Sequence, residues 1–257
     1  MKSPKFLLFA SLCCAASVHA KGPSTVAHDD ATQSAYTSGW NESGGGNGFG
    51  EWKFQQVTGT SNSYAGHFIA SGGESPEKAP VATDGKAFGL FANGSDFESI
   101  AAFRAFSNPL KTGDTFSFQM VNIAIEQKGD SDSPAAGAIG LTLRNGNASD
   151  THDDYNKNSR FEIIQLKGTD TYQIYDGESG HDSGVKCSDG GIAVSVTLTG
   201  ADTYDLEITR LVDKKTTKLK GRKFAGSGSV DSLCVFDRNG EKADGFFNNF
   251  EVSSGGK

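Results

Sequence analysis

The chain has 257 residues, with 24 Lys and Arg against 31 Asp and Glu, so its formal net charge is −7. A protein that binds nucleic acid through its phosphates carries a surplus of cations, so this balance argues against nucleic acid as a partner. Hydrophobic residues make up 36% of the chain and charged residues 21%, which is typical of a folded protein and not of a disordered one. The 33 glycines show no period of three, which excludes collagen and indicates many tight turns.

Residues 1–20 have the features of a secretory signal peptide. Lys2 and Lys5 form a charged start, an apolar run extends from Phe6 to Ala16, and Val18-His19-Ala20 fits a signal-peptidase site. The run is shorter than the roughly 20 residues that cross a bilayer, so we expect no membrane insertion of the mature chain. Cleavage near Ala20 predicts a secreted protein, extracellular or periplasmic, with 22 basic and 31 acidic residues and a charge of −9.

Residues 21–38 carry few large apolar side chains, which predicts a flexible N-terminal arm before a single folded domain over residues 39–257. Trp40 and Trp52, the two tryptophans of the chain, flank the glycine-rich stretch Gly44–Gly50. This stretch lacks both the P-loop and the G-x-G-x-x-G spacing, so it predicts a loop and not a phosphate site. A tryptophan face can stack on a sugar ring, so both residues are candidates for ligand binding; the alternative is that both anchor the core.

Alternation of apolar and polar residues recurs through the domain and predicts strands. Thr115–Met120 places two Phe and a Met on one face, and Ile192–Leu198 and Tyr204–Arg210 repeat the pattern on either side of a hairpin-like turn. Asp96–Phe106 shows some helical spacing, but its alternation favours a strand over Ile100–Phe106. Roughly a dozen strands at this spacing predict an all-β fold, a single β-sandwich of jelly-roll type.

The segment 145–158 supplies three carboxylates and several amides within one loop. Calcium takes six to eight oxygen ligands of this kind, so Asp150, Asp153, Asp154 and Asn156 are candidate metal ligands. The spacing does not match an EF-hand, and the alternative is a solvated acidic loop.

Three tyrosines, Tyr155, Tyr172 and Tyr175, complete the aromatic candidates for ligand binding. If these rings and the two tryptophans form an exposed, coplanar row, they would make a platform for a sugar. Burial of the rings would remove this support.

Cys187 and Cys234 are the cysteines that remain after signal cleavage. In an oxidising compartment they could form one disulfide, whose loop of about 47 residues would be worth roughly 4 kcal/mol in the chain-entropy model. The alternative is two buried free thiols, because a sequence cannot show whether the two Cα atoms come within reach.

Short blocks rich in Gly, Asn and aromatic residues follow one another along residues 39–252. They are Trp40–Trp52, Gly66–Ile69, Ala87–Asn93, Gly113–Ser117, Leu198–Tyr204 and Phe246–Phe250. This order of blocks resembles secreted bacterial β-sandwich proteins, which are similar in architecture to concanavalin A-like and laminin-G-like jelly rolls. The resemblance implies a concanavalin A-like sandwich with carbohydrate binding and calcium.

Motifs of several enzyme classes are absent from the sequence. It has no Gly-x-Ser-x-Gly elbow, no His-Glu-x-x-His and no Glu-x-Asp-x-x-Glu pattern, so no catalytic residue is proposed. The function predicted from the sequence is a secreted, non-catalytic module that binds a polysaccharide or other glycan. The alternatives are a structural extracellular or envelope protein and a glycan-active hydrolase.

Overall fold

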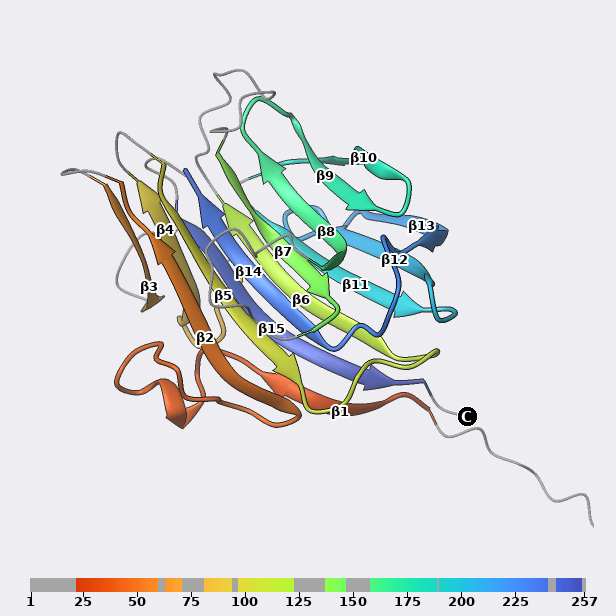
Figure 1. Ribbon diagram of the computed structural model, residues 1–257, viewed down its shortest axis with the longest axis horizontal. Helices are drawn as coiled ribbons and strands as arrows, with labels where there is room; N and C mark the ends of the chain where they lie inside the picture. The colour runs from red at the N-terminus through yellow and green to blue at the C-terminus, as the bar shows by residue number, and fades with distance from the viewer. Residues whose placement is uncertain are drawn as a thin grey trace, which may run out of the picture.

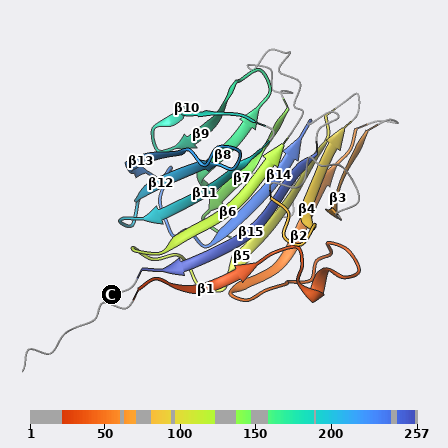
Figure 2. The ribbon, with the colours of Figure 1, turned by 180° about the vertical axis from the view of Figure 1, so that it is seen from behind.

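The chain folds into a sandwich of two antiparallel sheets. The computed structural model describes residues 22–59, 63–70, 81–93, 97–122, 137–146, 158–188, 190–239 and 244–255, so the expected signal peptide lies outside the described residues. Figures 1 and 2 show the two sheets packed face to face, as an aligned sandwich requires. The predicted all-β sandwich is confirmed, and the described part of the chain contains no helix with the length and apolar character that a bilayer crossing needs.

Sheet A contains eight strands, with the order β13-β12-β11-β6-β15-β4-β3 and with β1 paired to β15. Its strands in chain order are β1 (Ser24–Asp29), β3 (Tyr64–Ala70), β4 (Ala87–Asn93), β6 (Thr115–Asn122), β11 (Ile192–Leu198), β12 (Thr203–Arg210), β13 (Thr216–Lys223) and β15 (Gly245–Ser254).

Sheet B contains seven strands in the order β10-β9-β8-β7-β14-β5-β2. Its strands in chain order are β2 (Phe49–Val57), β5 (Ser99–Phe106), β7 (Ala138–Arg144), β8 (Ser159–Leu166), β9 (Thr171–Asp176), β10 (Ser179–Lys186) and β14 (Ser232–Arg238). A single 3-10 turn, η1 (Ser34–Tyr36), is the helical element among the described residues.

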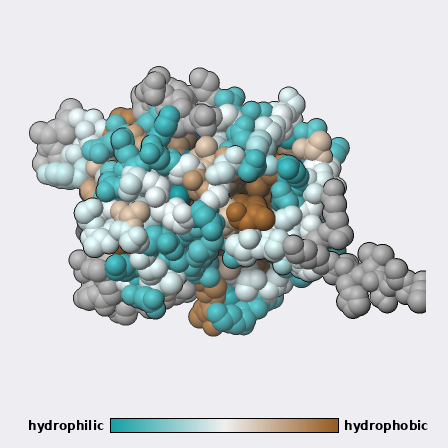
Figure 3. All heavy atoms as spheres, turned by 90° about the horizontal axis from the view of Figure 1, so that it is seen from below, coloured by the Kyte–Doolittle hydropathy of each residue, from teal (hydrophilic) through white to brown (hydrophobic). Residues whose placement is uncertain are grey.

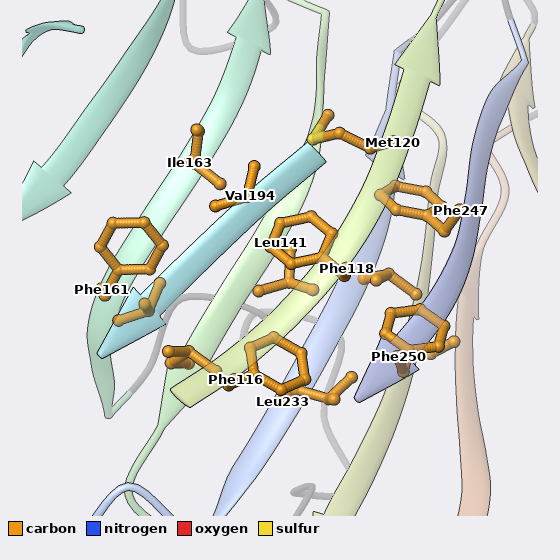
Figure 4. Packing of buried hydrophobic residues seen from close by; sticks show 14 of the residues in the cluster. Phe116, Phe118, Met120, Leu141, Phe161, Ile163, Val194, Leu233, Phe247 and Phe250 are labelled. Carbon is orange, nitrogen blue, oxygen red and sulfur yellow. The ribbon is translucent and has the colours of Figure 1, made fainter. Parts of the chain in front are cut away.

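The core lies between the sheets and is built from the alternation seen in the sequence. In β11 every second residue, from Ile192 to Leu198, is buried, while the residues between them are half-buried. Figure 4 shows the phenylalanines of β6 and β15 facing aliphatic and aromatic side chains of β7, β8 and β14. Because each strand buries one face against the opposite sheet, the hydrophobic effect selects this register.

The strand predicted over Ile100–Phe106 is confirmed as β5, and the helical alternative is wrong. β5 lies between β14 and β2 in sheet B, and all its residues except Ala105 are buried, so both of its faces are covered. Ile100 and Ala102 belong to the core between the sheets, whereas Ala101 and Phe103 are buried on the outer face of sheet B. Burial on both faces explains why the segment is apolar almost throughout.

The N-terminal arm predicted over residues 21–38 is not a flexible arm, and this expectation is corrected. Ser24–Asp29 forms β1, which pairs with the end of β15, and Tyr36 of the following turn is buried. Figure 1 shows β1 lying alongside β15 at the lower end of the sandwich. Polar contacts hold this segment, which is why a count of its apolar residues missed it.

A buried ion pair between Asp29 and Arg104 connects the two sheets. Asp29 ends β1 of sheet A, and Arg104 lies on the inner face of β5 in sheet B; both side chains are fully buried. The Tyr36 hydroxyl donates a hydrogen bond to Asp29 over 2.5 Å and accepts bonds from the Trp52 indole at 3.0 Å and the Gly45 amide at 2.9 Å. Arg104 also donates to the Gly45 carbonyl oxygen at 2.7 Å. The network therefore fixes β1, η1 and the glycine-rich loop at once.

A second cross-sheet cluster of the same composition lies near the β9–β10 hairpin. Asp176, at the end of β9, accepts a hydrogen bond from the Tyr204 hydroxyl of β12 at 2.6 Å. Arg222 of β13 approaches the same carboxylate at 3.1 Å and Glu178 at 2.8 Å. Each of the two clusters thus joins an Asp, an Arg and a Tyr across the sandwich.

Replacing Arg104 with methionine should destabilise the protein by about 3–5 kcal/mol, because the Asp29 carboxylate would stay buried without its counter-charge. Arg160→Met is the matched control. Arg160 is also buried, but its partner Asp202 is largely exposed and would remain solvated, so the loss should be smaller. Urea unfolding of both variants measures the difference. Equal losses in the free energy of unfolding would show that the buried pair stabilises the fold no more than the half-exposed pair does.

Candidate functional site

One row of side chains crosses the outer face of sheet B. Phe161 and Ile163 of β8 point into the core, so Glu162 between them points outward. Register pairs Glu162 with Tyr175 of β9 on one side and with Thr142 of β7 on the other. Tyr175 is in turn paired with Gly180 of β10. We call the outward-facing group of Tyr175, Glu162 and Gly180 the Tyr175–Glu162 face.

The ring of Tyr175 rests on the backbone of Gly180. A Cβ built on Gly180 would lie 2.6 Å from Cε1, 3.0 Å from Cδ1 and 3.2 Å from Cζ of this ring, so a side chain at that position would displace the tyrosine. The missing side chain lets the ring lie against the neighbouring strand, a device that supports aromatic residues in sheets. Tyr175 nevertheless remains 40% exposed, so part of the ring is open to solvent.

Glu162 is a buried carboxyl group beside this exposed ring. It is only 8% exposed, and burial raises its pKa to about 7 even though Arg238 and Arg144 act in the opposite direction. No residue in the described ranges donates a hydrogen bond to its carboxyl group or forms an ion pair with it. The Glu162 oxygen atoms are not fully enclosed, so a donor group of a ligand can reach them.

The two tryptophans are core residues, so the prediction that they stack on a ligand is corrected. Trp40 is 3% exposed and Trp52 is fully buried. Trp40 packs edge-on against Trp52 at 5.1 Å and against Phe54 at 5.3 Å, and the Arg104 guanidinium covers the Trp52 ring at 4.8 Å. Because protein atoms already occupy both rings' surroundings, neither face can receive a sugar. The alternative stated for the sequence, that both tryptophans anchor the core, is the one the structure shows.

The tyrosine candidates divide in the same way. Tyr172 is fully buried within the core between the sheets, whereas Tyr175, three residues later, points outward. Tyr155 and the candidate calcium ligands Asp150, Asp153, Asp154 and Asn156 lie outside the described residues. Calcium binding by this loop therefore stays a prediction from the sequence. Among the residues that the structure describes, no three His, Cys, Asp or Glu side chains form a metal-binding group.

The predicted disulfide between Cys187 and Cys234 is not formed, and both cysteines are free. They lie on opposite faces of sheet B: Cys187 packs against the core between the sheets, and Cys234 packs with Phe103 and Phe236 on the outer face. A bridge would have to pass through the sheet, so the fold separates the two thiols. Burial raises the pKa of both, which keeps them as neutral thiols at physiological pH.

A pocket of about 260 Å³ opens at the lower end of the sandwich, beside the β1–β15 pair. Figure 3 views this end, where small apolar areas are surrounded by polar surface. Val26, Phe106 and Leu110 line it, together with the polar residues Lys111 and Asp114. The Asp114 carboxylate already accepts the Lys111 amide at 2.9 Å. No unpartnered buried group points to a ligand here, so the Tyr175–Glu162 face is the stronger candidate.

The chain was compared with protein families, curated proteins and solved structures. No protein-family model and no curated protein matches it. Arcelin-5, a lectin-like defense protein from Phaseolus vulgaris, is similar with a TM-score of 0.42 and 10% identity, covering 80% of this chain and 93% of its own. The carbohydrate recognition domain of Emp47p is similar with a TM-score of 0.43 and 13% identity, and the match covers 88% of this chain and 99% of that domain. The Ca²⁺-bound exoplasmic/lumenal domain of VIP36 is similar with a TM-score of 0.43 and 8% identity, and the match covers 79% of this chain and 83% of that domain.

These likenesses are too distant to assign a role to any residue of this chain. The two-sheet antiparallel sandwich is defined by the strand pairings of the chain itself. The chemistry of the site rests on the side chains described above.

The sequence alone did not single out Glu162, although it contained a signal. In Phe161–Leu166 both alternating faces carry apolar residues, with Phe161 and Ile163 on one and Ile164 and Leu166 on the other. Such a strand is covered on both sides, so a glutamate within it must be buried as well.

Glu162→Gln should have little effect on stability at pH 5 and should stabilise the protein relative to wild type at pH 8. The pKa of Glu162 is about 7 in the folded protein and lies near its ordinary value of 4.5 when unfolded. The folded state therefore binds the proton more tightly, and wild type loses stability as the pH rises from about 4.5 to 7, whereas glutamine does not titrate. Urea unfolding of both proteins at the two pH values measures this. The same difference in stability at pH 5 and pH 8 would contradict the raised pKa.

Proposed function

We propose that this protein is a glycan-binding module and that a sugar ring binds at the Tyr175–Glu162 face. The observation that carries the proposal is the pairing of an exposed aromatic ring, supported from behind by Gly180, with a buried carboxyl group that lacks a partner. Sugars combine apolar ring faces with hydroxyl groups, so this pairing matches both halves of their chemistry.

Each group has a definite role in this complex. The open part of the Tyr175 ring contacts the apolar C–H face of the sugar, which removes both from water. The Glu162 carboxyl group accepts hydrogen bonds from sugar hydroxyls when ionised and can also donate one when protonated. Asp182 and Gln173, paired with each other two residues along β10 and β9, share this face by alternation and add polar groups at its margin.

Binding fits the site better than hydrolysis. A retaining glycosidase needs two carboxyl groups about 5–5.5 Å apart. Within the described strands, the charged groups that act on Glu162 are the guanidinium groups of Arg238 and Arg144. A hydrolase remains the alternative function, and release of reducing sugar from a bound polysaccharide would establish it. A purely structural protein would bind no glycan at all.

We also propose that the module acts outside the cytoplasm, after cleavage behind Ala20. The support is the charged start, the apolar run and the Val18-His19-Ala20 site of the sequence. Mass spectrometry of the exported protein should find Lys21 at the N-terminus, and a chain that retains Met1 would contradict export by this route.

Tyr175→Ala should weaken glycan binding about tenfold, or roughly 1.4 kcal/mol, because the stacking surface is lost. Tyr175→Phe should bind like wild type, since the ring and not the hydroxyl makes the contact. Binding is measured on an array of neutral and acidic oligosaccharides and then by calorimetry with the best ligand.

Tyr64→Ala is the matched control, because Tyr64 is an exposed tyrosine, 60% accessible, on edge strand β3 of the other sheet. It should leave binding unchanged. Equal binding by Tyr175→Ala and wild type would refute the site, and a wild type that binds no glycan would refute the function.

A further inference from the structure

The segment 214–223 is strongly basic on a chain that is acidic overall. Six of its ten residues are cations and none is acidic, whereas the whole chain carries 24 cations in 257 residues. The cations are Lys214, Lys215, Lys218, Lys220, Arg222 and Lys223. The segment includes all of β13, which is the edge strand of sheet A.

A bulge in β13 arranges these side chains. Tyr204 pairs with Arg222 and Leu206 pairs with Leu219, so two residues of β13, Lys220 and Gly221, face the single residue between them on β12. Tyr204 and Leu206 point into the core, which makes Arg222 and Leu219 inward residues as well. The positive φ of +64° at Gly221 allows this extra residue.

The bulge therefore separates the cations into an inner one and an outer set. Arg222 turns inward and is held by Asp176 and Glu178. Without the bulge, strict alternation from Leu219 would direct Arg222 outward and Lys223 inward. With it, Lys218, Lys220 and Lys223 lie on the outer side of the edge strand.

Four of the lysines keep an uncompensated charge. Lys218 forms an ion pair with Glu207 at 2.6 Å, and the nearby Asp213 is held by Arg210 at 3.2 Å. Asp202 is likewise paired with a buried arginine. This leaves a row of exposed amino groups with no ion-pair partner among the described residues, formed by Lys214, Lys215, Lys220 and Lys223. We call these four residues the β13 lysine row.

Protection of a sheet edge does not by itself account for this row. Lysines on an edge strand discourage pairing with another chain, and one inward or outward charge often suffices. The other edge strands of this protein carry few: β3 has no Lys, Arg, Asp or Glu, and β2 and β10 have one lysine each. The concentration of positive charge is specific to β13.

We propose that the β13 lysine row binds an anionic polysaccharide chain, at a site separate from the Tyr175–Glu162 face. Lys214 and Lys215 lie in the turn before β13, and Lys220 and Lys223 lie within it, so the row follows the edge strand along its length. The Asp205 and Glu207 carboxylates of the neighbouring strand limit the positive surface to about the width of one strand. A single extended polyanion fits this line, and a duplex with two phosphate backbones does not.

Single-stranded nucleic acid fits less well for a second reason. Proteins that bind it combine a basic groove with aromatic rings on which bases stack. The segment 214–223 contains no aromatic residue, and Phe224, which follows it, is buried. Charge without stacking groups favours a polymer whose affinity comes from its carboxylate or sulfate groups.

The test is binding of polygalacturonate, an acidic polysaccharide, with dextran as a neutral control. The variant in which all four lysines of the row are changed to glutamine should bind polygalacturonate at least tenfold more weakly than wild type. Its affinity should also depend less on salt concentration, because fewer counterions are released. The variant with four Lys→Arg changes keeps the charge and should bind like wild type.

A matched control changes four lysines elsewhere, Lys53, Lys86, Lys111 and Lys186, to glutamine. It has the same net charge as the first variant and should retain binding within about twofold. Equal loss of polygalacturonate binding in both variants would show a general charge effect and overturn the proposal. A wild type that does not bind polygalacturonate would overturn it as well. Tighter binding of oligo(dT) through the same lysines would overturn the polysaccharide assignment in favour of nucleic acid.

Two further measurements separate this site from the proposed glycan site. Tyr175→Ala should retain polygalacturonate binding, and loss of binding in that variant would overturn the claim of a separate site. If Tyr175→Ala instead affects binding of no glycan while the lysine variant loses polygalacturonate binding, the proposed Tyr175–Glu162 site fails and the lysine row stands.

Discussion

The ion pair between Asp29 and Arg104 is the contact on which the N-terminal third of the fold depends. It crosses the interior from sheet A to sheet B, and both charges are fully removed from water. Such a pair is costly to assemble and still costlier to break, because a lone charge would remain inside. Its value is therefore in specifying one arrangement: only when β1, Tyr36 and the glycine-rich loop are all in place does Asp29 meet Tyr36 and Arg104 while Arg104 also reaches the Gly45 carbonyl oxygen.

The Asp176 cluster performs the same role at the far side of the sandwich. It joins β9 of sheet B to β12 and β13 of sheet A through Tyr204 and Arg222. The two clusters thus fasten strands that the hydrophobic core holds less firmly, since β1 and β13 bury few large apolar side chains. In this fold the central strands are positioned by apolar burial, and polar clusters position strands at the margin.

This division explains how much of the fold could be predicted. Strands with an alternating apolar face, such as Thr115–Met120 and Ile192–Leu198, are predictable because the alternation itself indicates which residues are buried. The polar strands β1 and β10 lacked that signal, so β1 was mistaken for a flexible arm. Their positions follow from hydrogen bonds and ion pairs to residues far along the chain, which spacing within a segment cannot reveal.

The candidate site was predictable in part for the same reason. Tyr175 was among the aromatic candidates, but its partner Glu162 was not, because strand register alone brings them together. The two tryptophans were predicted as ligand-binding residues but lie in the core. A large aromatic ring can stack on a sugar, yet its apolar area makes burial equally favourable. Only the surrounding packing decides between these roles, as the edge-on contact of Trp40 with Trp52 shows.

Strand β9 connects the two proposed binding surfaces physically. Consecutive residues of a strand point to opposite faces, so Tyr175 faces outward while Asp176 faces inward. Asp176 holds Arg222, and the bulge that turns Arg222 inward is the feature that leaves the lysines of β13 outside. One buried carboxylate therefore lies next to both surfaces, since Asp176 follows Tyr175 in β9 and holds Arg222 of β13. A change at Asp176 would disturb both surfaces without touching either ligand, because its effect would be transmitted through the backbone of β9 and the position of β13.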